Sequence, residues 1–184
     1  IHMARKLRMS PADVLEAVRE AVRRARRLVP DVEFSAEDAT RSEVEFLCRI
    51  FDAVIRAGAT VINVPDTVGY TLPFEFGELI RTLMERVDGI ESVILSVHCH
   101  NDLGLAVANS LAAVELGVNH VQGTMNGVGE RCGNAPMEET VLALLTLYGI
   151  DVGIQYGKLN ELSKMVNELS GIEAPENRPF IGGK

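Results

Sequence analysis

The sequence predicts an α/β fold: half of a TIM (β/α)8 barrel, made of four parallel βα modules plus flanking helices. Short runs rich in Val, Ile and Phe alternate with amphipathic stretches, and the repeating unit is about thirty residues long. Near-continuous apolar runs such as 93–97 suit parallel strands that are covered on both faces. No glycine-rich nucleotide fingerprint follows the first run, which disfavours a doubly wound dinucleotide-binding fold.

The elements follow in order along the chain. Strands are predicted at 31–34, 61–64, 93–98 and 120–123, and the helices that follow them at 42–57, 73–87, 103–116 and 138–147. A first helix, 10–28, has Ser10 as its N-cap and Pro11 at its first helical position. A last helix is predicted at 156–170. Residues 1–172 are therefore assigned to the partial barrel, and 173–184, rich in Pro and Gly, to a linker-like tail.

Composition excludes several classes of protein. The net charge is −8 and no basic stripe runs along the chain, so we expect no nucleic-acid partner. No apolar run is long enough to cross a membrane, and no signal peptide is evident. The cysteines Cys48, Cys99 and Cys132 are scattered and odd in number, which favours reduced thiols in a cytoplasmic protein.

Two histidines at the end of the third predicted strand are the first candidate site. Side chains alternate across a strand, so His98 and His100 project to one side and Cys99 to the other. Neutral imidazole is the commonest nitrogen ligand for a metal ion. The spacing predicts either two metal ligands or a pair of hydrogen-bonded core histidines.

Polar residues also follow each of the other predicted strands. In a barrel, the loops after the strands gather at one face and build the active site. The alternative is that these residues are helix N-caps or turn residues, which Asp38, Asp66 and Asp102 could be. Four polar strand ends in register favour one shared site.

The segment after the fourth strand is a glycine-rich loop. Gly127, Gly129 and Gly133 permit positive φ and a close approach of the backbone to a ligand. Asn134 offers a neutral amide oxygen. Two imidazoles and one oxygen suit a divalent ion such as Mn²⁺, Mg²⁺ or Zn²⁺.

Four segments carry a specific resemblance to a known family: 32–41 (VEFSAEDATR), 65–70 (PDTVGY), 96–104 (SVHCHNDLG) and 126–134 (NGVGERCGN). Together they resemble the 2-isopropylmalate synthase family, which belongs to the metal-dependent TIM-barrel synthases and lyases. Homocitrate and citramalate synthases are near relatives. The resemblance implies a divalent metal as cofactor, acetyl-CoA as co-substrate and a 2-oxoacid as substrate.

The resemblance also implies roles for individual residues. The metal ligands would be His98, His100 and Asn134. Glu37 and Glu130 would serve acid–base chemistry, and Thr67 would contact the 2-oxoacid. The implied reaction condenses acetyl-CoA with 3-methyl-2-oxobutanoate in leucine biosynthesis.

The chain departs from the family at its beginning. The family's first strand carries an Asp-x-Thr-Leu-Arg-Asp-Gly segment, which supplies a metal carboxylate and a catalytic arginine, and no segment here matches it. We expect modules five to eight of the barrel and a chain that is inactive alone. The alternatives are a fragment of homocitrate or citramalate synthase, or a non-catalytic folding module.

A half-barrel has two open edges, here near Glu33 and Val121. Open strand edges template association with another chain, and apolar residues facing inward would otherwise meet water. We therefore expect a homodimer or a complex with the missing N-terminal half-barrel.

Overall fold

The computed structural model describes residues 2–182, except for the side chain of Ala4. Its strands form one parallel sheet in sequence order. They are β1 (Glu33–Ser35), β2 (Val61–Asp66), β3 (Ile94–Cys99) and β4 (His120–Gln122). The four predicted strands are thus confirmed. The outer two are short, and each of them pairs with a single neighbour within the described residues.

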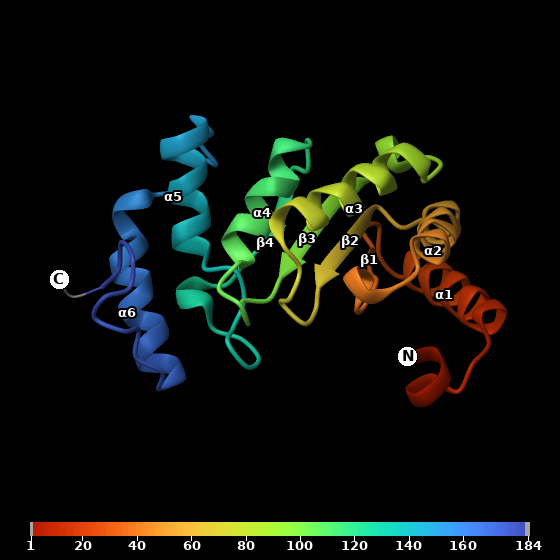
Figure 1. Ribbon diagram of the computed structural model, residues 1–184, viewed down its shortest axis with the longest axis horizontal. Coiled ribbons are helices and arrows are strands. Elements are labelled where there is room, and N and C mark those ends of the chain that lie inside the picture. The colour runs from red at the N-terminus through yellow and green to blue at the C-terminus, as the bar shows by residue number, and fades with distance from the viewer. Residues whose placement is uncertain (1, 183–184) are drawn as a thin grey trace.

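Helices connect the strands and flank the sheet (Figure 1). The α-helices are α1 (Pro11–Arg26), α2 (Val44–Ala57), α3 (Pro73–Arg86), α4 (Ala106–Glu115), α5 (Met137–Tyr148) and α6 (Leu159–Ser170). Short helical turns are η1 (Met3–Leu7), η2 (Ala39–Arg41), η3 (Ile90–Ser92), η4 (Met125–Gly127) and η5 (Tyr156–Lys158). The predicted helices are confirmed in type and order.

The ends of two helices show how local sequence sets their bounds. The Ser10 side chain accepts a hydrogen bond from the Asp13 backbone N–H, and the Asp13 carboxylate closes a capping box at the start of α1. Helix α4 begins at Ala106, later than predicted. Before it, Gly104 takes a positive φ of 72°, and Asn101 Oδ1 accepts from the Ala106 N–H at 3.2 Å.

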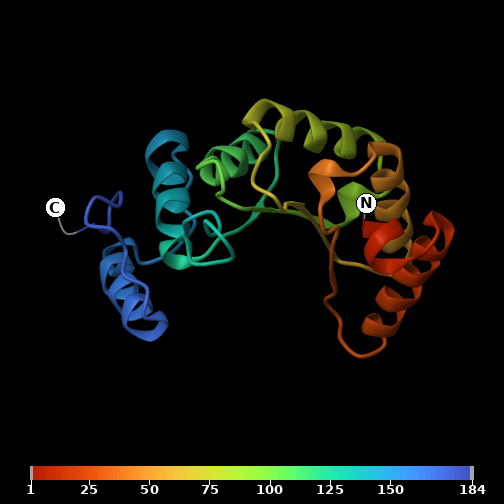
Figure 2. The same cartoon turned by 60° about the horizontal axis from the view of Figure 1, so that its bottom comes forward.

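The helices form an arc around the convex side of the sheet (Figure 2). Beneath them lies the apolar core, which includes Phe51 of α2, Ile62 of β2, Phe76 of α3 and Val97 of β3, all fully buried. Burial of each such side chain stabilises the fold by about 1.5–3 kcal/mol. Helix α1 packs against α2 and lies at the end of the arc.

The concave side of the sheet is polar at its centre. Register pairs Ser35 with Asn63, Asn63 with Ser96, and Ser96 with His120, so these side chains share one face. Gln122 Nε2 donates to Glu33 Oε1 at 2.8 Å, which joins the first and last strands across this face. Such a contact between outer strands requires strong curvature, as in part of a barrel. Apolar residues are expected to face inward; the centre of this face is instead polar.

The C-terminal region packs beside the fourth module. Asn126 Nδ2 donates to Ser163 O at 3.0 Å and so ties η4 to α6. In the tail after α6, which the sequence predicts to be linker-like, Arg178 Nε lies 3.0 Å from Glu139 Oε1. Ile181 contacts the small apolar cluster around Met125. Within residues 2–182, none of the helices has the length and apolar character needed to cross a membrane.

Candidate metal and substrate site

The histidine pair stands at the carboxyl end of β3. The rings of His98 and His100 lie edge to face with their centroids 5.1 Å apart, while Cys99 is buried on the other side of the strand beside Ser110 of α4. The predicted alternation is confirmed. Burial raises the pKa of the Cys99 thiol to about 12, so this cysteine stays protonated and serves packing.

Asn134 meets the histidine pair from the β4–α5 loop. It forms an isolated antiparallel bridge with His100, and its backbone N–H donates to Gly127 O at 3.1 Å. The Asn134 amide nitrogen donates to Val128 O at 3.2 Å. The amide oxygen therefore points away from Val128. A Cβ on Gly129 would lie 2.5 Å from that amide nitrogen, so the glycine makes room for the side chain.

Two buried atoms of this cluster have no partner among residues 2–182: His100 Nδ1 and Asn134 Oδ1. A buried polar atom without a hydrogen bond costs free energy unless a ligand satisfies it. Burial lowers the pKa of His100, and the nearby His98 and Arg131 lower it further, so its imidazole is neutral at pH 7. A neutral imidazole and a free amide oxygen are suitable donors for a divalent cation. The described residues hold no group of three or more His, Cys, Asp or Glu suited to a metal ion, so His98 and His100 have no third ligand of these types there.

Thr67 lies in the loop after β2, and its hydroxyl oxygen and its carbonyl oxygen each accept a hydrogen bond from another loop. Its hydroxyl oxygen accepts from the Asp38 backbone N–H at 2.9 Å, and its carbonyl oxygen accepts from Arg131 Nη2 at 2.7 Å. Asp38 sits after β1 in the left-handed region, with φ 66° and ψ 37°. Its carboxylate receives two hydrogen bonds of 2.8 Å from Arg41.

The two glutamates that the resemblance implicates have exposed side chains. Glu37 lies 3.1 Å from Lys6 Nζ, and both side chains are exposed. Glu130 lies within the glycine loop, its side chain is 79% exposed, and its Oε2 lies 3.5 Å from Arg131 Nη1. The structure thus brings His98, His100 and Asn134 together, and holds Thr67 through the loops around them.

Sequence reasoning missed the partners of three aspartates. Asp66 is fully buried and accepts from Thr40, Thr71 and Asn109. Asp102 receives 2.8 and 3.0 Å hydrogen bonds from Arg131, which hold the pKa of Asp102 below its ordinary value. The third aspartate, Asp38, is bonded to Arg41. None of these contacts is a helix cap. Two of them are local, Arg41 with Asp38 and Thr71 with Asp66, and the others join residues more than twenty positions apart in the sequence.

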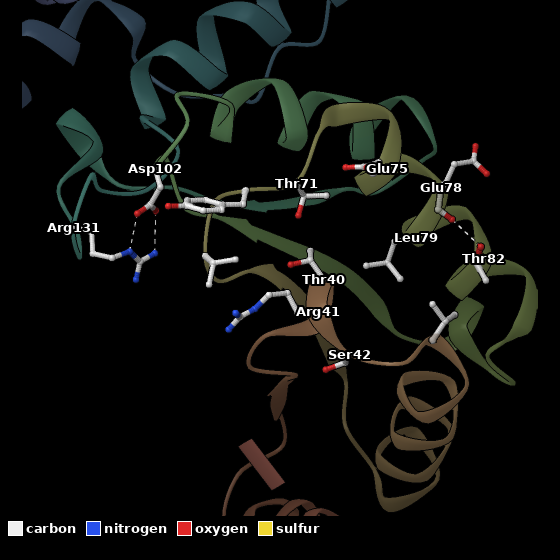
Figure 3. A pocket seen from close by; sticks show the side chains of 13 residues that line it. Thr40, Arg41, Ser42, Thr71, Glu75, Glu78, Leu79, Thr82, Asp102 and Arg131 are labelled. Carbon is white, nitrogen blue, oxygen red and sulfur yellow. Dashed lines mark hydrogen bonds and ion pairs between the residues drawn. The ribbon is translucent and has the colours of Figure 1, made fainter. Parts of the chain in front are cut away.

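A cavity of about 800 Å³ opens beside these loops (Figure 3). Thr40, Arg41 and Ser42 line it from the β1 side, Thr71 and Leu79 from the loop and helix after β2, and Asp102 with Arg131 closes one end. Its volume is in the range of small-molecule sites. Since Arg41 and Arg131 are each bonded to a carboxylate, the cavity does not present free positive charge from these two residues.

The chain is similar in sequence to 2-isopropylmalate synthases. It is 54% identical to that of Pelotomaculum thermopropionicum and 54% identical to that of Pyrococcus furiosus, over 99% of this chain in each case. The matched region is 37% of each of those proteins, so the chain spans a little over a third of their length.

Solved structures agree on the fold. The HMG-CoA lyase of Bacillus subtilis superposes with a TM-score of 0.79 at 20% identity, covering 98% of this chain and 62% of that one. An Acinetobacter baumannii HMG-CoA lyase, solved with coenzyme A and 3-methylmalate, gives a TM-score of 0.72 at 22% identity, covering 91% of this chain and 57% of that one. The HMGL-like family model matches residues 1–166. This chain, a four-stranded part of an α/β barrel, belongs to the HMGL-like family.

Proposed function

We propose that this chain contributes the metal-binding half of the barrel of a 2-isopropylmalate synthase. The reaction is a condensation of acetyl-CoA with 3-methyl-2-oxobutanoate, in the leucine pathway of the cytoplasm. The observation that carries the proposal is the cluster of His98, His100 and Asn134 at the carboxyl end of the sheet. In this cluster, His100 Nδ1 and Asn134 Oδ1 are buried and have no hydrogen-bond partner among the described residues. The similarity to enzymes of that name supports the assignment.

In the proposed reaction, a base removes a proton from the acetyl methyl group, and the carbon attacks the keto carbon of the 2-oxoacid. The keto oxygen gains a proton to become an alcohol, and water cleaves the thioester to release CoA. His98, His100 and Asn134 would hold a divalent ion such as Mn²⁺, Mg²⁺ or Zn²⁺, which would supply Lewis-acid chemistry to this reaction.

Thr67 orients the 2-oxoacid through its hydroxyl group. The hydroxyl oxygen already accepts from the Asp38 N–H, so its single hydrogen is available to donate to the substrate carboxylate. Glu37 and Glu130 are proposed as acid–base groups. Both are exposed in the loops that follow β1 and β4 and can approach a bound substrate, Glu37 by leaving Lys6.

Metal binding is testable on the chain alone. Calorimetry with Mn²⁺ and with Zn²⁺ should detect binding that the His98→Ala variant lacks. The matched control is His120→Ala, because His120 is an exposed histidine on the same face of the sheet. Equal binding by the wild type and by both variants would reject the ligand set.

Activity is tested by supplying the rest of the barrel. The chain is co-expressed with the N-terminal barrel half of the Pelotomaculum synthase, and CoA release is measured with 3-methyl-2-oxobutanoate, 2-oxoglutarate and pyruvate. We expect a preference for the first substrate, and no turnover by the chain alone. A preference for 2-oxoglutarate or pyruvate would instead indicate a homocitrate or citramalate synthase, and a well-formed complex without CoA release would refute the proposed reaction.

A further inference from the structure

Arg131, at the tip of the β4–α5 loop, reaches the loops after β2 and β3. Its Nε and Nη2 donate to the two carboxylate oxygens of Asp102 at 2.8 and 3.0 Å. Nη2 also donates to the Thr67 carbonyl oxygen at 2.7 Å. Figure 3 shows the paired Asp102 and Arg131 side chains at one end of the cavity. One guanidinium group therefore connects three βα loops, and we call Arg131, Asp102 and the Thr67 carbonyl the loop clamp.

The backbone is shaped to allow this arrangement. Arg131 adopts φ 53°, in the left-handed region that residues other than glycine rarely adopt. Gly69 adopts φ 66°, and a Cβ there would lie 2.7 Å from Asp102 Oδ2 and 3.0 Å from His100 O. A side chain at position 69 would thus separate the β2 and β3 loops. The strained backbone of Arg131 and the close approach of Gly69 to the β3 loop both indicate that the surrounding structure fixes the geometry of the loop clamp.

An ordinary surface ion pair does not account for these contacts. Arg131 and Glu130 approach only to 3.5 Å, and the Glu130 side chain is almost fully exposed, so that contact contributes little. Asp102, in contrast, is 13% exposed and receives a two-pronged bond. Planar, paired donation to a carboxylate is a geometry that arginine provides and lysine does not.

We propose that Arg131 is a positioning residue that sets the distance between the 2-oxoacid contact Thr67 and the metal ligand His100. This inference rests on the proposed function for the roles of those two residues. The Thr67 carbonyl oxygen accepts a hydrogen bond from Arg131 directly. His100 is two residues before Asp102 on the same loop. Asn134 is three residues after Arg131, so the clamp also fixes the loop that carries the third candidate ligand.

The first test measures amide hydrogen exchange of the chain itself, which requires no substrate or metal. We expect Arg131→Gln and Arg131→Lys to raise exchange together in residues 67–70 and 101–104, by about tenfold or more. Arg56→Gln is the matched control, because Arg56 makes a comparable 3.0 Å bond to Asp88 on the surface. Exchange that rises only in the 127–134 loop, or nowhere, would overturn the proposal.

The second test uses the complemented barrel. We expect Arg131→Lys and Asp102→Asn to raise KM for the 2-oxoacid about tenfold, with KM for acetyl-CoA unchanged. A merely structural role would lower the amount of active enzyme without changing either KM. If the complemented barrel has no activity, the proposed function fails, whereas the exchange experiment still decides whether the clamp connects the loops.

Discussion

Asp38 shows what a single residue decides at this site. Its backbone N–H orients the Thr67 hydroxyl, and its buried carboxylate is bonded to Arg41, with His2 Nε2 3.0 Å away. The sequence places Asp38 after a strand, where it reads as a turn or cap residue. Its left-handed backbone and its contact with Thr67 depend on the neighbouring loop, 29 positions away, which local pattern does not specify.

Replacing Asp38 by Asn should make stability depend less on pH. Burial alone raises the pKa of Asp38, but the bonds and charge of Arg41, together with His2, outweigh burial and hold it below the ordinary 3.8. Ionised Asp38 therefore stabilises the fold above pH 3.8, and this contribution is lost as pH falls through the folded-state pKa. Asn tolerates the left-handed backbone and keeps the N–H. We expect a loss of about 1–2 kcal/mol at pH 7.

The measurement is urea unfolding of wild type and Asp38→Asn between pH 7 and pH 2.5. The difference in unfolding free energy should shrink below pH 3.8. Asp88→Asn is the control, since Asp88 has an exposed carboxylate bonded to Arg56. A difference that stays constant at every pH would show that the charge of Asp38 is not the cause.

At the scale of elements, the strands and helices follow from local pattern. Period-two and apolar runs mark the strands, while Ser10, Pro11 and the C-cap Gly58 mark helix ends. The same-face placement of His98 and His100 follows from strand alternation alone. The pairing of Asp102 with Arg131 could not be predicted, because it depends on how two loops 29 residues apart meet.

The β4–α5 loop should be the element least tolerant of added side chains. A Cβ on Gly133 would lie 1.9 Å from Gly127 O, a clash with backbone, and φ there is already +88°. The Gly133→Ala change should displace the loop, destabilise the fold by roughly 2 kcal/mol or more, and abolish metal binding through Asn134. Calorimetry with Mn²⁺ and thermal unfolding measure both effects.

Gly104 provides the matched control for this substitution. It also has a positive φ, +72°, but no atom lies within 4 Å of its added Cβ. Gly104→Ala should therefore cost only the backbone strain, about 1 kcal/mol, and leave metal affinity unchanged. Equal effects of the two substitutions would mean that strain at positive φ, and not the backbone clash, governs the loop.

At the scale of the whole molecule, the open edges of the sheet remain unpaired among the described residues. Beside β4, a groove of about 520 Å³ runs between α4 and α5. It is lined mainly by apolar side chains, among them Val118, Val121, Val141, Leu144, Ile150 and Val152. Because the concave face is polar at its centre, we expect the apolar groove and the unpaired strand edges to be the surfaces that favour association. We expect the partner to be a second copy of the chain or the complementary half of a barrel.

We therefore expect the isolated chain to form a dimer with about twice its mass of 20.0 kDa in light scattering at low micromolar concentration. If the β1 edge of one copy meets the β4 edge of the other, Val121→Lys and Ile150→Glu should both yield monomers, because each places a charge in the groove. Circular dichroism confirms that each variant is folded. Leu169→Glu, on an exposed face of α6, is the control and should stay dimeric. Dissociation by Leu169→Glu alone would indicate pairing through helical faces, and a folded wild-type monomer at every concentration would rule out association through these edges.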